Sequence, residues 1–224
     1  EVINKFDLVI FQQKNREKFA KRFHIKNFIT ILPPFFKVIQ KPLKKNPKLD
    51  VVFIGTWFPE RGFFFYELKK RGLNVDIYGP RWDRDKKYYR FLKENIHLKY
   101  YSVSEIPKIL NKYKIAIALY SKANNDDITH RSVEIPISGT VICSEKSKTL
   151  EKILINNKEA IYFKNANECK VNCIKLLKNP KKIKKIFFNS KNKLINKYNP
   201  ESEYVYDKII NYDHLKIKKE KFVI

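Results

Sequence analysis

Short runs of apolar and β-branched residues alternate along this chain with longer segments whose apolar residues recur at helical spacing. The clearest runs are 6–11 (FDLVIF), 50–54 (DVVFI) and 115–119 (IAIAL), and their composition favours strands. Residues 115–119 contain no polar side chain, which is typical of a central strand that is covered on both faces. Regular alternation of strands and helices predicts an α/β fold built on a doubly wound parallel sheet.

The same patterns place the other elements. Further strands are expected at 28–32, 74–78, 97–101, 140–143 and 160–163. Helices are expected at 14–23, 60–71, 86–94, 104–113, from 129 onward, and at 167–177, 180–198 and 202–210.

One polar, basic and proline-broken stretch, 37–49 (KVIQKPLKKNPKL), interrupts this alternation and is interpreted as an interdomain linker. Residues 1–36 then form the tail of an amino-terminal α/β domain, 50–212 the main domain, and 213–224 a basic tail. The chain contains no Met, so we expect a fragment of a longer protein. No signal peptide or membrane-spanning run is recognisable, which favours a cytoplasmic location.

The charge is strongly positive, with 48 Lys and Arg against 23 Asp and Glu, a formal net charge of +25. The lysines are scattered over the whole length, which favours a generally solvated surface. Attraction to an anionic membrane or to phosphorylated donors remains an alternative. No nucleic-acid motif is present, so no specific nucleic-acid partner is expected.

The cysteines do not form a disulfide framework, because there are only three, Cys143, Cys169 and Cys173. Cys169 and Cys173 lie four residues apart on an expected helix without a nearby histidine pair. Structural zinc binding is therefore not expected, and we interpret the cysteines as structural residues.

The loop after the strand at 50–54 is the first candidate site. Gly55 permits close approach of a ligand, and Pro59 can open a helix whose free N–H groups favour an anion. Arg61 in the first turn can add a forked grip on a diphosphate, although a solvated helix position is the alternative. No G-x-G-x-x-G or G-x-x-x-x-G-K-[ST] motif occurs.

The loop after 115–119 is the second candidate site, because Asp127 or Thr129 can cap a helix that follows it. Glu134 lies one turn into this helix and can accept hydrogen bonds from both hydroxyls of a ribose. Arg131 and the helix N-terminus would meet phosphate oxygens. A local surface pairing of Glu134 with His130 and Arg131 is the alternative.

A metal site is a competing hypothesis, since Asp83-Arg84-Asp85 is a D-x-D sequence of the kind that holds Mg²⁺ or Mn²⁺ against a diphosphate. Such triplets arise often by chance, and we expect no metal.

Four segments in order, VVFIGTWFPERG, DIYGPRW, DDITHRSVEIPISGTVICSE and EAIYF, resemble the CgeB-like glycosyltransferases, relatives of the family 1 type with the GT-B fold. The resemblance covers about 50–210, and it implies that the chain is the carboxy-terminal, donor-binding half of such an enzyme. One departure is Pro136-Ile137-Ser138 ahead of Gly139, where the family usually has alanine and cysteine or glycine.

The resemblance implies a role for each matching residue. Arg61 would contact the donor diphosphate, Arg131 phosphate or sugar, Glu134 the ribose, and 101–103 the base. The implied donor-binding residues are Gly55, Thr56, Arg61, Tyr101, Ser102, Val103, Thr129, His130, Arg131 and Glu134.

We therefore expect a metal-independent, hexosyltransferase-type transfer of sugar from a nucleotide-diphosphate donor. Arg61 and Arg131 would be the catalytic residues, through electrostatic stabilisation of the leaving diphosphate. No cofactor is expected, the base would come from the amino-terminal, acceptor-side domain, and the acceptor is an unknown saccharide, lipid or protein. The alternative is a non-catalytic anion- or nucleotide-binding module with a basic surface for membrane or nucleic acid.

Overall fold

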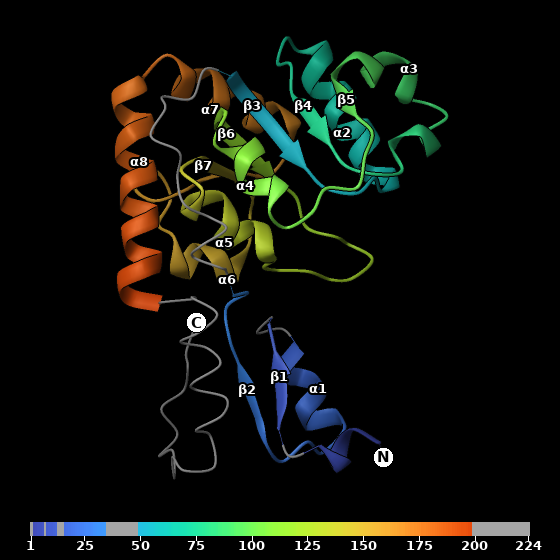
Figure 1. Cartoon of the computed structure of the whole chain (residues 1–224), viewed down its shortest axis with the longest axis vertical. Coiled ribbons are helices and arrows are strands. Elements are labelled where there is room, and N and C mark those ends of the chain that lie inside the picture. The colour runs from blue at the N-terminus through green and yellow to red at the C-terminus, as the bar shows by residue number, and fades with distance from the viewer. Residues whose placement is uncertain (1, 7, 13–15, 35–48, 199–224) are drawn as a thin grey trace.

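A six-stranded, wholly parallel sheet forms the centre of the molecule, seen in a computed structural model that describes residues 2–6, 8–12, 16–34 and 49–198 (Figure 1). The spatial order is β5-β4-β3-β6-β7-β8. The strands are β3 Leu49–Ile54, β4 Asp76–Tyr78, β5 Ile96–His97, β6 Tyr113–Ala118, β7 Val141–Glu145 and β8 Ile161–Phe163. Chain order reverses between β3 and β6, which confirms the doubly wound α/β prediction.

Helices cover both faces of this sheet (Figure 1). They are α2 Pro59–Lys70, α3 Tyr89–Leu92, α4 Glu105–Leu110, α5 His130–Ile137, α6 Lys148–Ile153, α7 Ala166–Leu177 and α8 Pro180–Lys193. Successive strand residues point to opposite faces. Val52 and Ala116 therefore join one buried cluster with α4, α5 and α6, whereas Val51 and Ile115 join another with α2 and α7. Burial on both faces explains the uninterrupted apolar run in β6.

A small strand–helix–strand unit precedes the main domain and lies below it in Figure 1. It consists of a 3₁₀ turn η1 Val2–Lys5, then β1 Val9–Phe11, α1 Glu17–Arg22 and β2 Phe28–Thr30, with β1 and β2 parallel. Its elements are those expected from the sequence, but shorter. Of the expected linker, 37–48 lies outside the described residues, whereas Leu49 already belongs to β3, so that boundary was wrong by one residue.

The strand expected at 97–101 is mostly wrong, because β5 contains only Ile96 and His97. These two residues pair with Ile77 and Tyr78 of β4. Beyond that point β4 gives way to Gly79, whose φ is 155°, and no further strand backbone remains for β5 to pair with. The chain instead turns toward α4.

Three further boundaries differ from the expectations. Helix α6 was not expected; it begins where the Ser147 side chain accepts a hydrogen bond from the Leu150 backbone N–H at 3.1 Å. Helix α3 is short and continues as a 3₁₀ turn, η4 Lys93–Asn95, and α8 ends in a π turn, η5 Leu194–Tyr198. The expected helix at 202–210 and the basic tail at 213–224 lie outside the described residues. Within the described part of the chain, no helix is both long and apolar enough to span a bilayer.

Candidate functional site

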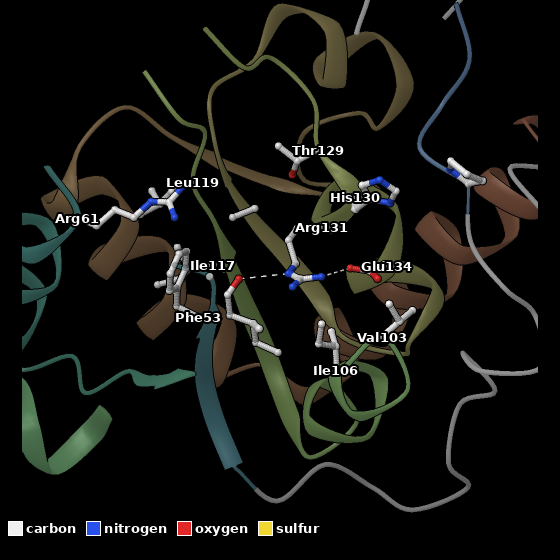
Figure 2. Close-up of a pocket in the computed structure, with 14 residues that line it drawn as sticks. Phe53, Arg61, Val103, Ile106, Ile117, Leu119, Thr129, His130, Arg131 and Glu134 are labelled. Atoms are coloured by element: carbon white, nitrogen blue, oxygen red, sulfur yellow. Dashed lines mark hydrogen bonds and ion pairs between the residues drawn. The ribbon is translucent and has the colours of Figure 1, made fainter. Parts of the chain in front are cut away.

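A cavity of about 470 Å³ opens where β3 and β6 end, at the point where the strand order reverses. Parallel sheets bind ligands at this position, because loops from the two halves diverge there and leave a crevice. The lining residues are Pro34, Phe53, Ile54, Gly55, Arg61, Val103, Ile106, Ile117, Ala118, Leu119, Thr129, His130, Arg131 and Glu134. Most of the polar ones come from the two loops that the sequence singled out (Figure 2).

The Gly55 loop is held in place by the segment after β4. The Gly55 N–H donates to the Tyr78 carbonyl at 2.9 Å, and the Trp82 indole N–H donates to the Gly55 carbonyl at 3.0 Å. A Cβ on Gly79 would lie only 2.1 Å from that carbonyl oxygen, so glycine is required there. The Y-G-x-x-W segment thus supports the first strand–helix loop by packing against it.

Arg61 is buried, with 7% of its surface exposed, although it lies in the first turn of α2. Its Nη1 donates to the Thr56 carbonyl at 2.6 Å, and its guanidinium packs over the rings of Phe53 and Phe58. Among the described residues, its Nε–H has no hydrogen-bond partner. The interpretation of Arg61 as a solvated helix residue was therefore wrong.

Burial lowers the pKa of Arg61 to about 10, because the charged form loses solvation; the nearby carboxylates of Glu60, Asp126 and Glu145 oppose this effect. The side chain is thus cationic at neutral pH. A buried cation with an unused N–H at a cavity wall is suited to an anionic ligand, which would satisfy both the charge and the donor.

Arg131 and Glu134 lie across the cavity from Arg61, on α5 (Figure 2). Arg131 Nε donates to the Ile54 carbonyl at 3.2 Å, and Nη1 forms an ion pair with Glu134 Oε2. The guanidinium therefore links the end of β3 to α5. The local Arg–Glu pair considered from the sequence does form, but it lines the cavity and Glu134 is only 5% exposed.

Glu134 keeps accepting capacity in this arrangement, because a carboxylate offers about four lone-pair positions and Arg131 contacts one of its oxygens. Helix α5 begins after Thr129, whose backbone N–H donates to Ser132 Oγ at 3.2 Å. The helix continues through Pro136 to Ile137, and Gly139 follows at a φ of 92°. The substituted turn ahead of Gly139 therefore leaves α5 intact.

The cavity brings together seven of the ten donor-binding residues expected from the sequence: Gly55, Arg61, Val103, Thr129, His130, Arg131 and Glu134. Thr56 acts through its carbonyl, which holds Arg61. Tyr101 and Ser102 do not line it. The Tyr101 ring packs edge-on against Tyr78, and Ser102 Oγ contacts the Glu105 carboxylate at 2.9 Å near the start of α4.

Apolar wall residues such as Ile54 and Leu119 were missed by the sequence reasoning. Their position at or just after the end of a central strand was the signal that could have identified them.

The two carboxylates of the D-x-D sequence do not act together. Asp85 is buried, and its Oδ2 accepts from the Trp57 indole N–H at 3.0 Å. Its Oδ1 accepts from the backbone N–H groups of Lys87 and Tyr88, at 3.2 and 2.9 Å. Asp83 is exposed. Asp85 is therefore a structural acceptor that closes its own turn.

Comparison with solved structures places this fold among the GT-B glycosyltransferases. TarM of S. aureus, solved with UDP bound, has a TM-score of 0.71 at 21% identity, covering 94% of this chain and 44% of its own. Anabaena HepE, also solved with UDP, has a TM-score of 0.74 at 10% identity, covering 95% and 65%. The C-terminal domain of LpcC from Francisella tularensis has a TM-score of 0.57 at 13% identity, covering 73% and 98%.

These likenesses show the fold, a Rossmann-like α/β domain of GT-B type. The chain belongs to the glycosyl transferase-like family, whose model matches residues 60–205. No curated protein matches the sequence. The chain spans 44% of the length of TarM, so it corresponds to less than half of that structure.

Proposed function

We propose that this chain is the donor-binding half of a CgeB-like glycosyltransferase that transfers a hexose from a nucleotide-diphosphate sugar. One observation carries the proposal: a cavity at the strand-order reversal has a guanidinium on each side, from Arg61 and Arg131, and a buried carboxylate, Glu134. HepE has also been solved with UDP-glucose, which supports a nucleotide-sugar donor.

The cationic groups match the charge that develops in the reaction. As the bond to the sugar breaks, negative charge builds on the leaving diphosphate. Arg61 and Arg131 are already positioned by the Thr56 and Ile54 carbonyls, so little reorganisation is needed when this charge appears. Glu134 faces the same space and can accept hydrogen bonds from a ribose diol.

Metal independence is part of the proposal, because the two guanidinium groups can supply the positive charge that a divalent ion would otherwise provide. The only D-x-D sequence has one aspartate already hydrogen-bonded within its own turn. The acceptor and its base are assigned to the amino-terminal, acceptor-side domain, of which 1–36 would be the end.

Titration calorimetry with UDP, GDP and other nucleoside diphosphates tests the proposal. We expect measurable but weak binding, since the second wall of the cleft belongs to the other domain. EDTA should leave the affinity unchanged. A folded sample that binds none of these ligands would refute the donor-site assignment.

A further inference from the structure

All three cysteines of the chain converge in the core beside β7, although they are distant in sequence. Cys143 lies on β7, and Cys169 and Cys173 lie one turn apart on α7. Their three sulfur atoms are all within 4.8 Å of one another, and the Sγ atoms of Cys143 and Cys173 are 3.8 Å apart. The expectation of isolated structural cysteines missed this convergence, because Cys143 reaches the pair only through the packing of α7 on the sheet.

The spacing of the sulfurs fits a single central ion. Bonds of about 2.3 Å, the length of a Zn–S bond, place three sulfurs about 4 Å apart around an ion in their plane. In the part of the chain that the structure describes, the group consists of thiols alone, without His, Asp or Glu. Such a donor set selects a soft ion that accepts three ligands.

The surroundings select the charge of that ion. Each cysteine is at most 1% exposed, and the three belong to an apolar cluster that includes Phe163, Leu176 and Ile186. Three thiolates leave a net charge of −1 around Zn²⁺ and −2 around Cu⁺, and an uncompensated buried charge is costly. Around a trivalent ion the complex is neutral. Structural zinc also takes four ligands, one more than the described group offers.

We infer that Cys143, Cys169 and Cys173 form a binding site for a trivalent thiophilic metalloid, arsenic(III) or antimony(III). Arsenous acid, As(OH)₃, is uncharged and condenses with three thiols to give As(SR)₃ and three waters. Each step forms one As–S bond, breaks one As–O bond and releases the thiol proton with the departing hydroxide as water. Arsenic stays trivalent, and no net charge enters the core.

The site is separate from the proposed donor cavity, since none of the three cysteines lines it. Burial raises the pKa of the Cys169 thiol, so a protonated, neutral thiol is favoured before the ligand arrives. Because the sulfurs are enclosed, the ligand must enter through local opening of α7 against the sheet, and we expect slow association.

The test is incubation of the reduced, folded chain with arsenous acid, followed by native mass spectrometry. We expect one adduct whose mass is that of one arsenic atom less three hydrogens. After denaturing in acid, no thiol should react with a thiol reagent, and the adduct should raise the Tm of the native protein. Zn²⁺ at the same concentration should bind more weakly.

Cys143→Ala, Cys169→Ala and Cys173→Ala should each lose the three-coordinate adduct and the rise in Tm. Ile142→Val is the matched control, since it changes a buried β7 residue that belongs to the other core cluster, and it should keep both. The Tm without ligand shows whether each variant folds. Wild-type protein that keeps its mass and three reactive thiols would overturn the inference, whatever the variants do. So would stoichiometric Zn²⁺ binding without arsenic binding.

Discussion

Glu134→Gln separates recognition of the ribose from recognition of the diphosphate. The substitution keeps the size of the side chain and one oxygen acceptor, but it removes the negative charge that faces the cavity and Arg131. A hydrogen bond to a charged group contributes about 1.5–3 kcal/mol. Since about 1.4 kcal/mol corresponds to a factor of ten in affinity, nucleoside diphosphate binding should weaken about 10- to 100-fold.

Inorganic diphosphate is the matched control ligand, because it has the same phosphate groups and no ribose. Titration calorimetry of wild type and variant with both ligands gives the comparison. Diphosphate affinity should barely change, since its partners are Arg61 and Arg131. An equal loss for the two ligands, or no loss for either, would refute the assignment of Glu134 to the ribose.

The same variant must be checked for folding, because Glu134 is buried and paired with Arg131. The Arg131 side chain is 26% exposed, so water screens part of the charge that loses its partner. We expect a loss of about 1 kcal/mol, which lowers the Tm by about 2–4 °C in a domain of this size. A variant that does not fold would identify the pair as structural and also refute the ribose assignment.

Three further predictions concern the diphosphate, the loop support and the charge. Arg61→Ala should weaken nucleoside diphosphate and inorganic diphosphate alike, about 10- to 100-fold by calorimetry, because its charge-assisted bonds go to phosphate; a loss confined to the nucleoside ligand would contradict this role. Gly79→Ala should destabilise the domain by about 2 kcal/mol or more in denaturant unfolding, since its Cβ would overlap the Gly55 carbonyl oxygen, whereas Gly72→Ala, also at positive φ but with no atom within 4 Å, should cost about 1 kcal/mol; equal losses would disprove the packing argument. Nucleic acid should bind only non-specifically, with a Kd of about 10⁻⁴–10⁻⁶ M near physiological salt; submicromolar, sequence-selective binding in an electrophoretic shift assay would show that the basic surface is a nucleic-acid site.

Much of the fold was predictable because its signals are local. The apolar run in β6 and the alternation of strands with helices follow from burial on both faces of a parallel sheet, which each segment encodes by itself. The positions of Arg61, Arg131 and Glu134 after central strands followed from the same reasoning, since the reversal of strand order always leaves its crevice at those ends.

The tertiary structure alone decided what these side chains touch. Whether Arg61 is solvated or buried depends on Phe53 and the Thr56 carbonyl, which approach it only when β3 and α2 pack. Whether β5 continues depends on where its neighbour β4 ends, a property of the pair rather than of either strand. Cys143 meets Cys169 and Cys173 across an interval of 26 and 30 residues for the same reason: side-chain contacts between distant elements are set by packing, and a one-dimensional pattern does not contain them.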